Sequence, residues 1–219
     1  MKNKATTTIT ITIGILLAFA GFEHGLFEAL QGYKPTGSYF IQAIGREMLW
    51  WKHGTEDAFT LIPNYLITGI CTMCVSIIIM FWSIFYLPQG ISATIFLLLF
   101  ILLVLVGGGI GFIPFFVITW AYATRINKPL TGCKKLLGEN IRRNIAFLWP
   151  YTLAATGTSW LIVIEIAVFG FVPGITDPDV KLAICWGFLL FSLFLINVSY
   201  ISGFAYDIDH NFQYKTKIA

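Results

Sequence analysis

The stretch ISATIFLLLFILLVLVGGGIGFIPFFVITWAYAT, residues 91–124, decides how many times this chain can cross a membrane. As one helix with ~1.5 Å per residue it would be about 51 Å long, and it would overshoot a ~30 Å hydrocarbon layer unless strongly tilted. Four glycines fall near its middle: Gly107, Gly108, Gly109 and Gly111. Because a run of glycines is a poor helix interior and a good tight turn, we favour two short helices joined there.

The chain as a whole is also strongly apolar. Hydrophobic residues make up 57% of the 219 residues and charged residues only 11%, whereas a soluble domain has roughly 25% charged residues. Apolar segments lie near residues 9–31, 59–86, 91–106, 108–124, 146–172 and 181–204. We therefore predict an all-α, multi-pass integral membrane helix bundle with six transmembrane helices, in which residues 1–219 form a single transmembrane helical domain. The alternative is five spans, with 91–124 as one long tilted helix.

Lysine and arginine are enriched in cytoplasmic loops and so bear on the topology. Six spans with the N-terminus inside put ten basic residues in the cytoplasm and four outside, and five spans give eleven and three. The rule does not decide between the two arrangements, but both place the basic 125–143 loop and the C-terminus in the cytoplasm. We expect the N-terminus there too, in a cell membrane, and we expect residues 1–20 to be retained although they resemble a secretory signal.

Two segments have the pattern of helices that lie on a membrane surface. Residues 36–57 carry the amphipathic aromatic side chains typical of headgroup level, and we expect an outer interfacial helix there. Residues 129–145 repeat apolar side chains every four positions opposite basic ones, which predicts a cytoplasmic amphipathic helix. Its basic residues predict contact with anionic lipid across the 125–143 segment. The expected partners are membrane lipids and a second copy of the chain or a partner membrane subunit, and not nucleic acid.

The stretch GFEHGLFEALQG, residues 21–32, puts ionisable groups at the end of the first apolar segment. At ~100° per residue, His24, Glu28 and Gln31 share one ridge of a helix. Beside it runs a stripe of small residues, of the kind that lets another helix approach closely in lipid: Gly14, Ala18, Gly21 and Gly25. The three ridge residues are therefore candidates for ligand binding or proton transfer. The alternative is a solvated, structural helix end.

Glu165 is a second acidic residue inside an apolar segment. With six spans it lies in the outer half of the membrane, as do the His24 and Glu28 ridge and Asn64 at the start of the second span. The predicted outer helix adds further polar side chains there: Arg46, Glu47, His53, Glu56 and Asp57. These groups predict a polar pocket in the outer half. With five spans the first two helices flip and the ridge separates from Glu165, so the site depends on the topology.

A metal site is a second interpretation of the same residues. His24 and Glu28 at positions i and i+4 could bind a divalent metal, with His53 and Glu56 as further ligands. The sequence has no H-E-x-x-H pattern or paired cysteine cluster, and nothing in it indicates haem or a nucleotide. At the end of the last span, YDIDHNF (residues 206–212) is interpreted as solvated charges that end a helix.

Three functions are compatible with these residues. The favoured one is a membrane protein that binds or transports a small polar solute or ion through an outer-half pocket, with Glu165 as proton or cation carrier and His24 and Glu28 as a ligand pair. The second is a metal-dependent membrane enzyme acting on a lipid-borne substrate. The third is a non-catalytic membrane sensor or assembly subunit. The sequence leaves open whether the chain is an enzyme.

Overall fold

A helix bundle with a small sheet at one end makes up the computed structural model, which describes residues 3–87, 89 and 92–218, with side chains as far as His210. The helices are α1 (Lys4–Leu30), α2 (Tyr65–Phe85), α3 (Ser92–Leu105), α4 (Ile113–Ala123), α5 (Thr131–Leu136), α6 (Glu139–Ile145), α7 (Trp149–Phe169) and α8 (Pro178–Ile218). The strands are β1 (Phe40–Gln42), β2 (Asp57–Thr60) and β3 (Val106–Gly109). Within these residues, α1, α2, α7 and α8 up to His210 are long and apolar enough to cross a membrane, which supports the prediction of a helical membrane protein.

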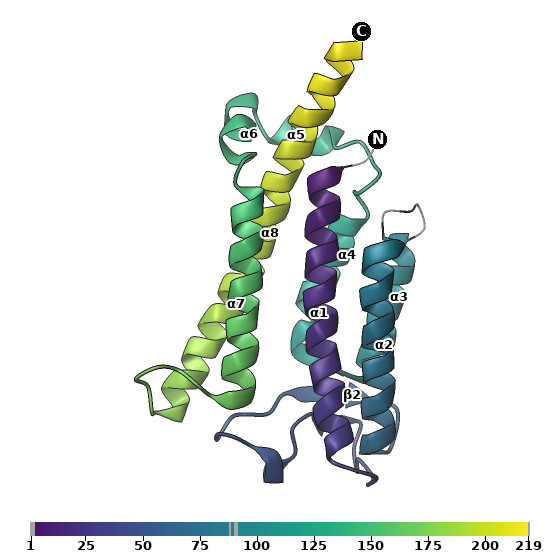
Figure 1. The fold of residues 1–219 in the computed structure, drawn as a ribbon, viewed down its shortest axis with the longest axis vertical. Coiled ribbons are helices and arrows are strands. Elements are labelled where there is room, and N and C mark those ends of the chain that lie inside the picture. The colour runs from purple at the N-terminus through teal and green to yellow at the C-terminus, as the bar shows by residue number, and fades with distance from the viewer. Residues whose placement is uncertain (1–2, 88, 90–91, 219) are drawn as a thin grey trace.

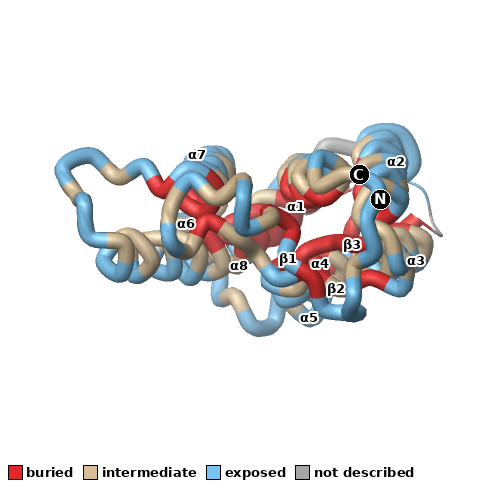
Figure 2. The backbone as a smooth tube through the Cα atoms, turned by 90° about the horizontal axis from the view of Figure 1, so that it is seen from below, coloured by how far each residue is buried: buried red, intermediate tan, exposed pale blue. Residues whose placement is uncertain are grey.

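Helix α1 lies in the middle of the bundle, between the α7–α8 pair on one side and α2 with α3 on the other (Figure 1). Both chain ends and the short helices α5 and α6 lie at one end of the bundle, and the sheet lies at the other. Buried residues gather along α1, α4 and the strands, whereas the outward faces of α2, α7 and α8 are exposed (Figure 2). Those faces carry large apolar side chains such as Phe81, Leu190 and Phe194, as contact with lipid requires.

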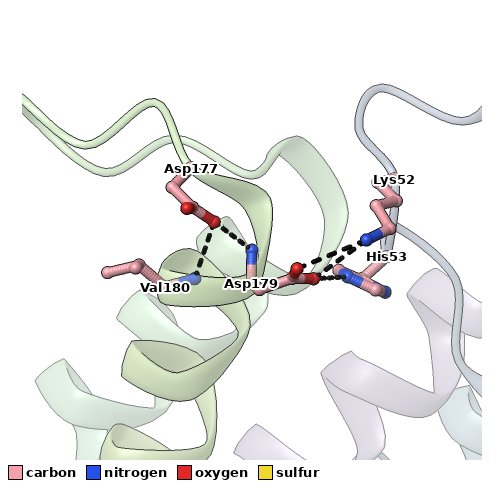
Figure 3. Close-up of polar contacts among 5 residues, drawn as sticks. All are labelled: Lys52, His53, Asp177, Asp179 and Val180. Atoms are coloured by element: carbon pink, nitrogen blue, oxygen red, sulfur yellow. Dashed lines mark hydrogen bonds and ion pairs between the residues drawn. The ribbon is translucent and has the colours of Figure 1, made fainter.

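Local sequence sets the ends of the long helices. Helix α2 begins where the Asn64 side chain accepts a hydrogen bond from the backbone N–H of Ile67. Helix α7 ends at Phe169 and is followed by Gly170, which has a φ of 62°. Helix α8 begins where the Asp177 carboxylate accepts hydrogen bonds from the backbone N–H groups of Asp179 and Val180 (Figure 3).

Helices α1 and α2 run antiparallel and pack closely through small residues. A Cβ atom at Gly25 would lie 2.7 Å from the carbonyl oxygen of Gly69, and one at Gly21 would lie 2.8 Å from Ser76 Oγ. A Cβ atom at Gly14 would meet Ser83 and the Phe96 ring of α3. Ala18 is fully buried in the hydrophobic core. The small-residue stripe of α1 therefore faces α2 and α3 inside this chain.

The segment from 91 to 124 does not form one long helix, so the arrangement that required one is wrong. Helix α3 ends at Leu105, β3 follows, and a 3-10 turn (Ile110–Phe112) leads into α4. The glycines form more than a turn, because β3 pairs antiparallel with β2, with Ala58 opposite Gly109 and Thr60 opposite Val106. Their backbone groups find partners in the sheet, which a helix interrupted by glycine could not offer as well.

The outer interfacial helix predicted over residues 36–57 is wrong. The described residues there form β1, a 3-10 turn (Arg46–Met48) and the start of β2, with Phe40 opposite Phe59 and Gln42 opposite Asp57. Glycines at 37, 45 and 54 interrupt any helix, and β3 supplies strand hydrogen bonds from far along the chain. The aromatic side chains that suggested an interfacial helix stand on strands and loops of a cap, by which we mean residues 32–64.

The predicted amphipathic helix over residues 129–145 is divided in two. Helix α5 ends at Leu136, and Leu137 adopts an extended conformation before α6 begins at Glu139. Gly138 at the break lowers the helix propensity. Leu130, just before α5, packs against Phe204 of α8.

The end of the last span is partly buried, so the interpretation of its acids as solvated charges is wrong for Asp207. Its carboxylate is 2% exposed and accepts hydrogen bonds of 2.9 Å from the backbone N–H groups of Ala5 and Thr6. It thereby caps the first turn of α1 from a distant part of the chain. Asp209 forms an ion pair with Arg142 of α6. These contacts join α1, α6 and α8 at the end of the bundle where the chain begins.

Candidate functional site

The polar end of α1 lies against the glycine strand β3. A Cβ atom at Gly107 would lie 2.4 Å from Glu28 Oε2, and one at Gly109 would lie 2.7 Å from His24 Cε1. Gly107 also has a φ of 129°, which side chains rarely adopt. Only glycine lets the backbone come this close at both positions. The glycine run therefore covers two ionisable groups of α1.

Glu28 is completely buried and incompletely hydrogen-bonded. Thr72 Oγ1 of α2 lies 3.5 Å from Glu28 Oε2, but the same hydroxyl lies only 2.6 Å from the carbonyl oxygen of Val106, to which it donates. Glu28 Oε1 has no partner among the described residues. A buried polar atom without a hydrogen bond typically costs about 1–3 kcal/mol. Glu28 therefore offers a buried acceptor to a proton or a cation.

His24 is joined to the cap. Its Nε2 is hydrogen-bonded to Oε2 of Glu56, the residue that directly precedes β2. The ring of Phe112 packs edge-on against the imidazole, with 5.1 Å between ring centroids. The imidazole side chain is 6% exposed, and its Nδ1 has no partner in the described part of the chain. One turn apart on α1, His24 and Glu28 thus contact the cap and α2 respectively.

Two of the predicted ligand residues have their side chains bonded to backbone. Gln31 Nε2 donates to the carbonyl oxygens of Gln42 and Ala43, at 2.9 Å each, and so holds the cap on the end of α1. Asn64 caps the first turn of α2 through Ile67. These hydrogen bonds give both side chains a structural role, separate from the buried His24 and Glu28 side chains.

Glu165 lies on a different side of the same region. Its side chain is exposed on α7, near enough to Glu23 of α1 for the two carboxylates to interact electrostatically. Glu23 is partly buried and lies beside His24, although it points off the ridge of His24 and Glu28. The structure therefore brings Glu165 to the neighbourhood of the ridge without burying it there.

The four metal-ligand candidates are not gathered in one place. His24 and Glu56 are in contact, but His53 Nε2 lies 2.7 Å from Asp179 Oδ1, at the start of α8 (Figure 3). Lys52 Nζ approaches the same carboxylate at 3.0 Å. Among the described residues, no group of three or more histidine, cysteine, aspartate or glutamate side chains is arranged to hold a metal ion.

A cavity of about 330 Å³ lies between the cap, the turn before α4, and helices α7 and α8. Its lining residues are Trp51, His53, Thr55, Glu56, Asp57, Ile110, Gly111, Phe112, Val163, Ala167, Leu182, Cys185, Trp186 and Leu189. A much smaller space of about 20 Å³ shares Glu56 and Phe112 with it and reaches His24 and Glu23. The pair of Glu56 and His24 therefore connects the cavity to the buried end of α1.

No protein-family model, curated protein or solved structure matches this chain.

Sequence reasoning did not single out Thr72, Phe112 or Trp186 as site residues. One signal was available for Thr72, because Thr68, Thr72 and Ser76 repeat every four residues and place hydroxyl groups on one face of α2. All three are buried, and the hydroxyls of Thr68 and Thr72 both donate to the carbonyl oxygen of Val106. No comparable pattern marks Phe112 or Trp186, which reach the cavity only because of how the helices pack.

Proposed function

We propose that this chain crosses the membrane six times, with the cap outside and the 125–143 segment in the cytoplasm. The positions of both chain ends and of α5 and α6 at one end of the bundle support an even number of crossings (Figure 1). Helix α3 has 14 residues, about 21 Å, and α4 is also short. Together they still extend from the end of the bundle that carries the basic 125–143 segment to the cap, because β3 continues from α3 and pairs with β2. The basic residues of 125–143 favour the cytoplasmic side for that end.

We further propose that the protein binds or transports a small polar solute or ion through the outer-half cavity. The observation that carries this proposal is the cavity of about 330 Å³, which is lined by Glu56, the hydrogen-bond partner of His24 at the buried end of α1. Small-molecule sites are typically mostly apolar cavities of roughly 300–1,000 Å³ with a few polar groups that orient the ligand. This cavity has that size and composition.

His24 and Glu28 are the groups we assign to binding or carrying a proton or cation. Both are buried, and each has one polar atom without a partner among the described residues. In membranes, buried ionisable side chains that face the bundle interior commonly mark the path of a solute or proton. Glu165, exposed on α7, is the weaker carrier, because solvent or headgroups can satisfy its charge without a ligand.

The test is a solute screen on protein in lipid nanodiscs, read out by melting temperature and by the fluorescence of Trp51 and Trp186. The blocking variant is Gly111→Phe, since Gly111 lines the cavity and a Cβ atom there meets nothing within 4 Å among the described residues. The control is Gly187→Phe, an exposed position on α8 with the same freedom from clashes.

We expect at least one class of small solute to raise the melting temperature of the wild type and of Gly187→Phe but not of Gly111→Phe. Flux of that solute into liposomes would then distinguish transport from binding alone. If every solute that stabilises the wild type also stabilises Gly111→Phe, the cavity is not the binding site.

A further inference from the structure

The wall of the cavity combines aromatic rings with carboxylates. Trp51, Phe112 and Trp186 contribute aromatic rings, and Glu56 and Asp57 contribute carboxylates. Among the described residues that line the cavity, none is a lysine or an arginine. Aromatic rings together with carboxylates are the groups that attract an organic cation, because the ring face and the carboxylate both carry negative potential.

The charges around the cavity are not balanced. Glu56 has His24 as its partner, and His53 is already bonded to Asp179, so neither histidine is available to Asp57. Asp57 makes no ion pair with any other described residue. Asp57 is therefore an exposed carboxylate beside the aromatic and aliphatic walls of the cavity, and it forms no ion pair with a described lysine or arginine.

We propose that the ligand of this cavity is a small organic cation, an amine or quaternary ammonium compound with an apolar body. Its charged group lies near Asp57 and Glu56, and its apolar part lies among the Trp51, Phe112 and Trp186 rings. The inference rests on the proposed function, since it names the class of solute that the cavity takes. A volume of about 330 Å³ is at the small end of the range for ligand sites, so the cation is small.

The experiment compares three probes that share a compact trimethyl group and differ in charge: choline, the neutral 3,3-dimethylbutan-1-ol and the anionic 3,3-dimethylbutanoate. Each is titrated into the full chain in nanodiscs, and binding is measured by tryptophan fluorescence and by saturation-transfer NMR. The variants are Asp57→Asn and the cavity-blocking Gly111→Phe. The control is Glu47→Gln, an exposed carboxylate of the same cap that does not line the cavity.

We expect choline to bind saturably, at least tenfold more tightly than either other probe. Asp57→Asn is expected to weaken choline binding about fivefold, because an exposed charge pair contributes up to about 1 kcal/mol. Glu47→Gln is expected to bind choline as the wild type does, and Gly111→Phe to bind none of the probes.

The unfavourable outcomes separate the two proposals. If the alcohol or the anion binds as tightly as choline and Gly111→Phe abolishes that binding, the cavity binds solutes but the cation class is wrong. Equal choline affinity in Asp57→Asn and wild type also overturns the cation class, because the unpaired carboxylate is its main support. If none of the probes binds the wild type, the cation proposal fails, and the broader solute screen then decides the proposed function by itself.

Discussion

At Gly107, an unusual backbone conformation lies beside the buried carboxyl group of Glu28. We predict that Gly107→Ala destabilises the protein by about 1–3 kcal/mol, because the new methyl group would lie 2.4 Å from Glu28 Oε2 and because a φ of 129° is strained for alanine. The control is Gly111→Ala, four residues further on, where a methyl group meets nothing within 4 Å among the described residues. The melting temperature in detergent should be lower for Gly107→Ala than for Gly111→Ala, and equal melting temperatures would contradict the close approach of β3 to Glu28.

Glu56 supplies the only hydrogen-bond partner that the described residues give to the imidazole of His24. We predict that Glu56→Ala lowers the free energy of unfolding by about 1–3 kcal/mol, since it leaves the buried ring without a partner at either nitrogen. Glu47→Ala, an exposed change on the same cap, should stay within about 0.5 kcal/mol of the wild type. Thermal unfolding followed by circular dichroism measures both, and a neutral Glu56→Ala would mean that the pair contributes no stability.

At the scale of whole elements, the contact between α1 and α2 depends on how closely two backbones approach. We predict that Gly25→Ala destabilises the bundle by about 1–3 kcal/mol, since its methyl group would meet the Gly69 carbonyl at 2.7 Å. Gly157→Ala on α7 is the matched control, because its nearest neighbour, Leu16 Cδ1, lies at an ordinary 3.8 Å. That change should be neutral or stabilising by roughly 0.4–1 kcal/mol. Loss of stability in both variants would point to a general effect of removing helical glycine.

The elements differ in how far the sequence could predict them. The long helices follow from apolar length alone, and the glycines at 107–109 correctly indicated that no single helix runs through 91–124. The cap could not be predicted from the sequence, because its strands depend on pairing between residues 57–60 and 106–109. Short strands have no signal of their own when their partners lie so far apart in sequence.

The candidate site could also be predicted from the sequence only in part. Helical periodicity placed His24 and Glu28 on one ridge, and the structure buries both. Local sequence could not show that Glu56 bonds to His24, that β3 covers Glu28, or that His53 turns to Asp179. Each of these contacts joins segments that only the fold brings together.

In the whole molecule, the cap contacts several helices that are far apart in the chain. Gln31 holds the cap to the end of α1, while Trp51 Nε1 donates to the Ala167 carbonyl of α7 at 3.0 Å. Lys52 and His53 reach Asp179 at the start of α8 (Figure 3). Trp51 and His53 also line the cavity, so contacts between the cap and the α7–α8 pair form part of its wall. Because Asp179 is exposed, these ion pairs contribute little stability and can open readily.

The proposed topology predicts which positions an impermeant thiol reagent reaches from outside the cell. In a chain with the native cysteines replaced, Tyr33→Cys on the cap should react in intact cells, because Tyr33 is 77% exposed. Native Cys133 in α5, restored alone, should react only after permeabilisation. Gly111→Cys should react from outside with a small cationic methanethiosulfonate, since it lines the outer cavity.

Gly111→Cys is the decisive position, because it tests whether the α3–α4 hairpin extends through the membrane to the cap. Reaction from outside requires the hairpin to reach the outer surface, so that α3 and α4 count as two crossings. Reaction only after permeabilisation, with Tyr33→Cys still labelled from outside, would reduce the chain to four crossings and a hairpin that enters from the cytoplasm. Labelling of Cys133 and not Tyr33→Cys in intact cells would invert the whole arrangement and move the cavity to the cytoplasmic half.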